Sequence, residues 1–162
     1  MTLLELIIAS TMLAAVMAAV SVVMRTSRQA WEAHEADYQR VEAAHATLRH
    51  IVRHVRRAVE VVDISDSADA SGQLSIVLSD GTVHVWDHDD GSSCVNYGED
   101  SASDLLASEI TGLRFTGYAA NGVTATAVPE QIRALLVEVD VQLPVEAGGQ
   151  RNIKSWVWLR SW

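Results

Sequence analysis

The hydrophobic positions form one uninterrupted run near the start of the chain. Residues 6–24 read LIIASTMLAAVMAAVSVVM and contain no charged residue, proline or glycine. An α-helix over this run is roughly 28 Å long, close to the thickness of the hydrocarbon core of a membrane. The run is long, and no basic residue precedes it, which argues against a secretory signal peptide. We therefore predict a transmembrane helix over residues 1–24.

After this run, hydrophobic residues recur at every third or fourth position as far as residue 62. This spacing places them on one face of an α-helix, with acidic residues and arginines on the opposite face. No proline or glycine interrupts the pattern, so residues 25–62 are predicted to continue the helix as an amphipathic segment. The positions on the apolar face are Trp31, His34, Tyr38, Val41, Ala44 or His45, Leu48, Ile51, Val55, Val59 and Val62. For Trp31 and Tyr38 two interpretations stay open, because large aromatic residues serve both as anchors at a membrane surface and as core residues.

From residue 63 onward the pattern changes to short runs of alternating residues separated by turn-forming residues. Residues 73–78 and 82–87 flank Ser79-Asp80-Gly81, and an Asp-Gly pair is a strong hairpin signal. A short strand or turn is predicted at residues 104–107, and a glycine turn at residues 148–149. Further strands are predicted at residues 93–97, 110–118, 132–143 and 152–160. Residues 63–162 are thus a β-rich globular part, and antiparallel strands packed on one long helix make an α+β fold.

The net charge of the 162 residues is −9, and the negative charge belongs to the β-rich part. Residues 1–62 contain six acidic and seven basic residues, whereas residues 63–162 contain fifteen acidic and five basic residues. This balance argues against nucleic acid as a partner, since nucleic-acid-binding domains carry a basic patch. Within the amphipathic segment, acidic residues gather at 32–42 and arginines at 49–57. This order either suits the helix dipole on a solvated surface or sets the register between staggered copies of the helix.

Motifs that carry catalysis are missing from the chain. It contains no G-x-S-x-G, no phosphate-binding glycine loop and no H-E-x-x-H. We therefore predict that the protein is not an enzyme and assign no catalytic residue.

Candidate metal ligands are sparse. His50 and His54 share a helix face, but arginines surround them and the ligand set is incomplete, so no metal site is predicted there. No cofactor is predicted. Calcium is the one candidate, although Gly91 comes too early for an EF-hand loop, and the other interpretation of its candidate ligands is a solvated acidic loop. Its candidate ligands are Asp87, Asp89, Asp90, Glu99 and Asp100. A single cysteine, Cys94, excludes a disulfide within the chain and a multi-cysteine zinc site.

Glu5 is the one ionisable residue before the apolar run ends. Burying it in lipid costs about 2.5–3.5 kcal/mol, so it needs either access to the membrane surface or a cation. No lysine or arginine occurs before Arg25. We expect that Glu5 cannot easily fold back on its own N-terminus, and that an α-amino group of another copy is its partner.

The first nine residues, Met-Thr-Leu-Leu-Glu-Leu-Ile-Ile-Ala, resemble the mature N-terminus of type IV pilins and type II secretion pseudopilins. The resemblance implies that a prepilin peptidase removes a leader before Met1 and that the new amine is N-methylated. It also implies that Thr2, Leu3 and Glu5 act in assembly, with Glu5 contacting the N-terminal amine of a neighbouring subunit. A second interpretation of Met1, as a translation initiator, stays open.

Three further patterns resemble the J-type minor pseudopilins and their pilus counterparts. They lie at residues 28–32, at residues 48–58, and in the predicted strand at 135–141 before Leu143-Pro144. Ala14 and Val22 stand where many members of the family have glycine and proline. We therefore predict that the helix stays intact through this stretch.

Together these features predict a structural subunit of a type IV pilus-like or type II secretion pseudopilus filament. We expect its N-terminal helices to pack into a bundle, with Trp31, Tyr38 and Val41 in contacts between subunits. The expected partners are further copies or sibling pseudopilins, an inner-membrane assembly platform, the prepilin peptidase and, before assembly, the lipid bilayer. The expected location is the inner membrane, with a single pass and a periplasmic C-terminal part, followed by the filament. The alternative is a membrane-anchored periplasmic binding module that recognises a ligand or a secretion substrate.

Overall fold

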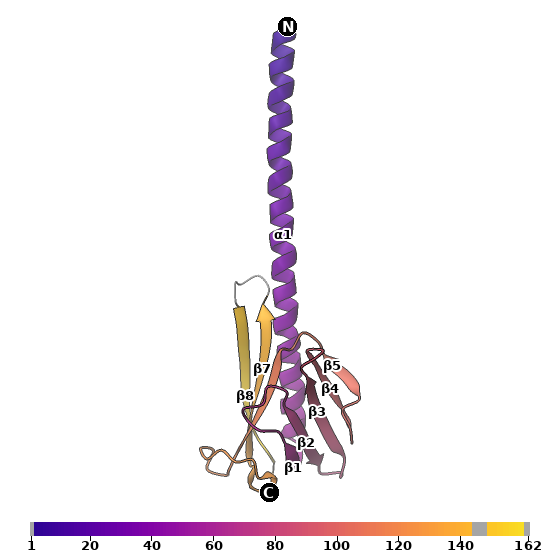
Figure 1. Ribbon diagram of the computed structural model, residues 1–162, viewed down its shortest axis with the longest axis vertical. Coiled ribbons are helices and arrows are strands. Elements are labelled where there is room, and N and C mark those ends of the chain that lie inside the picture. The colour runs from indigo at the N-terminus through magenta and orange to yellow at the C-terminus, as the bar shows by residue number, and fades with distance from the viewer. Residues whose placement is uncertain (1, 144–148, 161–162) are drawn as a thin grey trace. The chain divides into compact units, whose positions relative to one another are not determined.

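The computed structural model describes residues 2–143 and 149–160, and the chain divides into two compact parts, residues 1–37 and 38–162. One α-helix, α1 (Leu3–Val55), supplies residues to both parts (Figure 1). It runs through Ala14 and Val22 without interruption, which confirms the prediction of an intact helix in this stretch.

Helix α1 ends at Val55, so the prediction of a helix as far as residue 62 was wrong. Residues Ala58–Ile64 instead form strand β1, whose β-branched valines suit an extended backbone. Register shifts interrupt its pairing twice, and as a result Ala58, Val61 and Ile64 point inward at intervals of three. A bulged strand of this kind shows the same spacing of inward-facing positions as a helix. Val59 and Val62, which extended the predicted apolar stripe, are exposed.

Five strands form the first antiparallel sheet, in the order β1-β2-β3-β4-β5 (Figure 1). Each strand pairs with the next one along the chain. The bounds of the other four are β2 Gln73–Leu78, β3 Val83–Asp89, β4 Cys94–Glu99 and β5 Asp104–Ala107. The predicted strands at 73–78, 82–87, 93–97 and 104–107 are therefore all present, with small shifts at their ends.

The hairpin between β2 and β3 turns at the predicted Asp-Gly pair. Gly81 has φ = +87°, a conformation that glycine adopts without strain. Its N–H donates to the Leu78 carbonyl, and the Asp80 carboxylate accepts from the Thr82 N–H. The turn residues thus fix the register in which β2 and β3 pair.

Three strands form the second antiparallel sheet, in the order β6-β7-β8 (Figure 1). Their bounds are β6 Gly112–Tyr118, β7 Ala134–Leu143 and β8 Gly149–Trp158, and a short 3₁₀-helix, η1 Pro129–Gln131, precedes β7. The strands predicted at 110–118, 132–143 and 152–160 are therefore present with shifted ends, and the largest shift is in β8, which both begins and ends before the predicted strand does. Of the predicted glycine turn at 148–149, Gly148 lies outside the described residues, and Gly149 is the first residue of β8, where it pairs with Leu143, so the turn prediction was wrong at this position. With one helix and two antiparallel sheets, the α+β prediction is confirmed.

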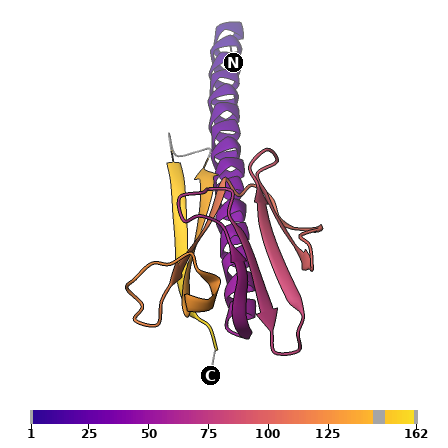
Figure 2. The ribbon, with the colours of Figure 1, turned by 60° about the horizontal axis from the view of Figure 1, so that its bottom comes forward.

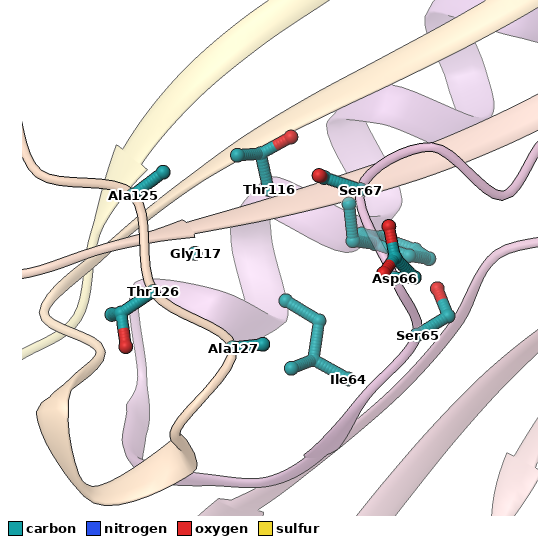
Figure 3. Close-up of a pocket in the computed structure, with 10 residues that line it drawn as sticks. Ile64, Ser65, Asp66, Ser67, Thr116, Gly117, Ala125, Thr126 and Ala127 are labelled. Carbon is teal, nitrogen blue, oxygen red and sulfur yellow. The ribbon is translucent and has the colours of Figure 1, made fainter.

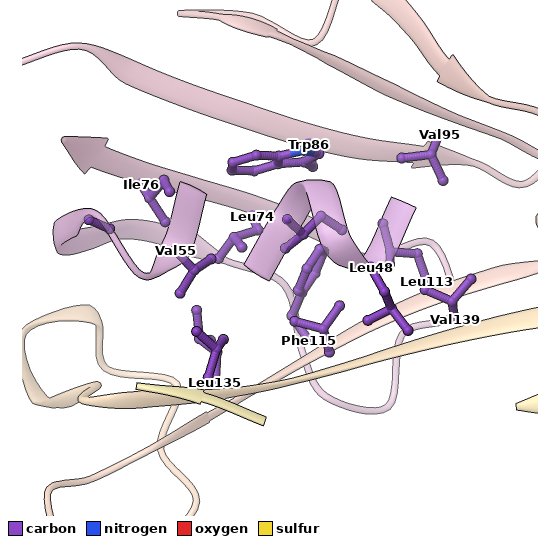
Figure 4. Packing of buried hydrophobic residues seen from close by; sticks show 14 of the residues in the cluster. Leu48, Val55, Leu74, Ile76, Trp86, Val95, Leu113, Phe115, Leu135 and Val139 are labelled. Carbon is purple, nitrogen blue, oxygen red and sulfur yellow. The ribbon is translucent and has the colours of Figure 1, made fainter. Parts of the chain in front are cut away.

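The core of residues 38–162 forms where the last turns of α1 lie between the two sheets (Figure 2). Figure 4 shows Trp86 of the first sheet on one side of the helix and Leu135 of the second sheet on the other. From α1 itself, Ala44, Leu48, Ile51 and Val55 are buried. These are four members of the predicted stripe, so the periodicity located the core-facing side of this part of the helix.

Candidate assembly surface

The N-terminal turns of α1 expose a continuous apolar surface, which we call the apolar segment and define as residues 3–24. None of its side chains is buried by the chain itself. By its length and composition, α1 is long and apolar enough to cross a membrane, and the stretch that qualifies lies near the N-terminus. Its large exposed hydrophobic residues are Leu3, Leu4, Leu6, Ile7, Ile8, Met12, Leu13, Val16, Met17, Val20, Val22, Val23 and Met24.

Three hydroxyl groups interrupt this surface, and each is satisfied within the helix. The Ser10 and Thr11 hydroxyls donate to the carbonyls of Ile7 and Ile8 at 2.9 Å. The Ser21 hydroxyl donates to the carbonyl four residues earlier at 2.8 Å. Since these polar groups already have partners, they add little to the cost of placing the apolar segment in lipid or against other apolar helices.

Glu5 has a hydrogen-bond partner in its own chain, contrary to our expectation. Its Oε2 oxygen accepts from the Thr2 N–H at 2.8 Å, and the Glu5 N–H donates to the Thr2 hydroxyl at 3.3 Å. This reciprocal pair is a capping box, and it satisfies two N–H groups that the first turn of a helix leaves free. The expectation that Glu5 cannot fold back on its own N-terminus was wrong, because it considered only cations, whereas backbone N–H groups also bind a carboxylate. The expected contact with an α-amino group of another copy stays a prediction.

The sequence contains the signal for this cap. Thr2-Leu3-Leu4-Glu5 matches the pattern of serine or threonine followed three positions later by glutamate. Of the other residues expected to act in assembly, Leu3 is exposed and belongs to the apolar segment, and Met1 lies outside the described residues. The capping bond occupies one oxygen of Glu5, so the carboxylate keeps a second oxygen for a further partner.

The three residues expected in contacts between subunits differ in their surroundings. Trp31 is 74% exposed and Tyr38 is 66% exposed, so the interpretation of these two as core residues was wrong. Trp31 lies beside Val23 and Met24 of the apolar segment. Val41, in contrast, is half-buried and packs against the core of its own chain. Trp31 and Tyr38 therefore remain free to meet lipid or another protein, whereas Val41 has a partner inside the fold.

The charged residues of α1 are paired within the chain to a large extent. Arg49 contacts Glu42 at 2.7 Å, and Arg40 contacts Glu109 at 2.9 Å. Arg40 also donates to the Gln142 carbonyl of β7. Two interpretations of this charge pattern were left open: a solvated surface, or a means of setting the register between copies of the helix. Because the charges already have partners within the chain, the contacts favour the solvated surface.

The acidic loops supply their own hydrogen-bond donors. The Asp89 carboxylate accepts from the Ser92 hydroxyl at 2.7 Å and from the Gly91 N–H at 3.0 Å. These two bonds lower the pKa of Asp89. Across the described ranges 2–143 and 149–160, no three His, Cys, Asp or Glu side chains come together in a way that could hold a metal ion.

Cys94 is half-buried, and its thiol donates to the Ser92 carbonyl.

A hollow of about 190 Å³ lies between the loop after β1 and the loop before η1 (Figure 3). Its lining consists mainly of small side chains and includes Phe115 of β6. Its one ionisable group, Asp66, accepts from the Ala68 N–H, so this carboxylate shapes its own loop.

In comparisons with known proteins, no family model, curated protein or solved structure matches this chain.

Proposed function

We propose that this protein is a structural subunit of a filament of the type IV pilin and pseudopilin kind. The observation that carries the proposal is the apolar segment, residues 3–24, which is long enough to cross a membrane and remains unburied by its own chain. The hydrophobic effect opposes leaving so much apolar surface in water. A bilayer covers this surface before assembly, and the same segments of neighbouring subunits cover it in the filament.

Residues 38–162 differ from the apolar segment, and this difference supports separate roles for the two in a filament. Residues 38–162 have their own core, formed by α1 and both sheets. They also carry most of the acidic residues of the chain, and this negative charge favours solubility. The folded part lies in the periplasm and then on the outside of the filament, while the apolar segment forms the shared interior. The subunit crosses the inner membrane once before an assembly platform extracts it.

In this proposal Glu5 has two tasks, one inside the subunit and one between subunits. It caps its own helix through the Thr2 N–H, and its remaining oxygen binds the N-terminal amine of a neighbouring copy or a sibling pseudopilin. A hydrogen bond between charged groups in an apolar surrounding is worth about twice a neutral one, so this pair contributes both attraction and register.

Substitutions at Glu5 and Thr2 separate the two tasks. Glu5→Gln keeps a side chain that completes a capping box but removes the charge, whereas Thr2→Ala removes half of the cap and keeps the charge. We expect filament yield, counted by electron microscopy, to fall below a tenth of the wild-type value in Glu5→Gln and Glu5→Ala. Thr2→Ala should keep most of the yield, and every variant should stay in the membrane fraction.

The reverse pattern would contradict the assembly role of Glu5. If Glu5→Gln assembles normally and Thr2→Ala does not, Glu5 acts as a helix cap and nothing more. If the wild-type protein in its native membrane forms no filaments at all, the alternative of a membrane-anchored module that binds a ligand or secretion substrate gains support. The mass of the N-terminal peptide tests processing, because a prepilin peptidase would leave Met1 methylated.

A further inference from the structure

Three histidines gather on the side of α1 that faces the first sheet. His50 and His54 come from α1, and His84 comes from β3. The ring centroids of His50 and His54 lie 4.4 Å apart, and those of His54 and His84 lie 5.0 Å apart. Together with Trp86 of β3 and Tyr97 of β4 they form what we call the histidine cluster.

Hydrogen bonds fix the positions of these rings, and one of them requires the neutral form of His50. The Trp86 Nε1–H donates to Nδ1 of His50 at 3.3 Å, which requires a free lone pair on that nitrogen. Nδ1 of His54 lies 2.9 Å from the carbonyl of His50, and an N–H at this position donates to it. Nδ1 of His84 lies 2.7 Å from the Tyr97 hydroxyl, and the two rings are stacked at an interplanar angle of 7°. A proton added to Nδ1 of His50 would face the Trp86 N–H, so two donors would oppose each other.

The surroundings of the cluster disfavour positive charge. Partial burial, then the nearby His54, Arg53 and His84, lower the pKa of His50 to about 4. Burial and His54 also lower the pKa of His84, and Arg57 acts in the same direction.

Two carboxylates oppose this effect on His84 from the sheet side. They are Glu99, at the end of β4, and Asp80, in the turn between β2 and β3. The same burial, with Glu99 nearby, raises the pKa of Tyr97, so its hydroxyl keeps its proton throughout the relevant pH range. The net effect at His50 and His84 is still toward the neutral form.

The opposite side of α1 is built differently. There the helix packs against apolar residues of β6 and β7, among them Phe115, Leu135 and Val139 (Figure 4). On these two strands, an ion pair joins Arg114 of β6 to Asp140 of β7. The ion pair of α1 with the loop before β6, Arg40 with Glu109, lies more than two helical turns before His50. Of the two helix–sheet contacts, the one with β3 and β4 therefore contains the imidazoles.

We propose that the histidine cluster is an acid-sensitive contact, which joins α1 to β3 and β4 at neutral pH and loosens when the surroundings become acidic. The contact between α1 and β7 keeps its strength over the same range. A subunit in an acidified medium would thus expose β3 and β4 while its helix stays attached to the second sheet.

The direction of the effect follows from the pKa of His50. A histidine in the unfolded chain binds a proton near pH 6.5, whereas His50 in the folded chain does so only near pH 4. Between these values the open state binds more protons, so stability rises with pH and is lost as the pH falls from 6.5 toward 4. We expect the opening constant of this contact to rise about tenfold between pH 7.5 and pH 5, after discounting for the part of the ring that meets water.

Hydrogen exchange of the full chain in detergent micelles tests the proposal. After correction for the intrinsic effect of pH, the opening constants of amides in β3 and β4 should rise about tenfold at pH 5 relative to pH 7.5. Those in β7 and β8 should change less than twofold. In His50→Gln, where an amide oxygen can accept from Trp86 and nothing titrates, the rise should shrink to about threefold or less.

His45→Gln is the matched control, because His45 is an exposed histidine of the same helix outside the cluster. It should behave as the wild type does. If His50→Gln does not fold, His84→Gln tests the same contact from β3. An equal rise in both sheets, a full rise in His50→Gln, or a C2-proton titration of His50 with an ordinary pKa would each overturn the proposal. Because assembly is not measured, these outcomes are independent of the proposed filament role.

Discussion

Helix α1 contributes to two parts of the molecule, and its apolar side chains meet different surroundings in each. Within residues 38–55, Ala44, Leu48, Ile51 and Val55 are buried between two sheets. Within residues 3–37, no side chain is buried. The later stretch has a charged face opposite its apolar stripe, whereas residues 6–24 are apolar on all sides. A striped helix can satisfy its apolar face within one domain, but a helix that is apolar all round needs a partner outside it.

The largest test of this comparison substitutes the same residue type in the two stretches. Ile51 is fully buried and Ile7 is 50% exposed. Ile51→Ala leaves a cavity between the sheets and should lower the free energy of unfolding by about 2–5 kcal/mol. Ile7→Ala leaves no cavity in the core, because Ile7 is exposed, and should leave the free energy of unfolding unchanged within about 0.5 kcal/mol. Urea unfolding in detergent micelles, followed by near-ultraviolet circular dichroism, measures both.

An equal loss of stability in the two variants would show that the first stretch packs on the folded part after all. Filament yield gives the converse comparison. If neighbouring subunits cover the apolar segment, Ile7→Ala reduces assembly although it leaves the fold intact.

Local pattern predicted the elements whose burial follows a simple period. The strand at 73–78 was predicted with its observed bounds, because turn-forming residues flank it on both sides. The Asp-Gly hairpin signal follows it and Gly72 precedes it. The end of α1 was missed, because two bulges in β1 make its buried residues recur as they would in a helix. Residues 58–64 are a strand because they pair with β2, which lies beyond the loop at residues 65–72. A local hydrophobic pattern carries no information about such a pairing.

The candidate sites show the same limit. The cap formed by Thr2 and Glu5 is local and has a sequence signature, so it was open to prediction. The histidine cluster was not, since His84 lies thirty positions after His54 and reaches it only through the meander of the first sheet. Sequence periodicity placed His50 and His54 on one helix face but gave no information about what that face meets.

A second test places a charge on an exposed valine in each part. Val16 lies in the middle of the apolar segment, and Val59 lies on β1; both are exposed. Val16→Arg should weaken membrane insertion by about 2.5–3.5 kcal/mol, which is roughly a hundredfold or more in partition. Val59→Arg should leave insertion unchanged and alter the stability of the fold by about 0.5 kcal/mol or less. Carbonate extraction of membranes followed by immunoblotting measures the partition. Retention of Val16→Arg at the wild-type level would show that residues 3–24 do not cross the bilayer.

The smallest expected effect comes from two exposed tryptophans. Trp156 on β8 contacts Tyr118 of the neighbouring β6–β7 ribbon, with ring centroids 4.4 Å apart, whereas Trp31 lies in the first stretch of α1. Trp156→Ala should lower the free energy of unfolding by about 1 kcal/mol through loss of this aromatic pair. Trp31→Ala should not change it, because the Trp31 side chain is exposed, but should weaken attachment to lipid or to a neighbouring subunit. Urea unfolding and filament yield, measured on both variants, separate these effects. A loss of stability in Trp31→Ala equal to that in Trp156→Ala would mean that the two parts of the chain share an aromatic contact, and the comparison between them would no longer hold.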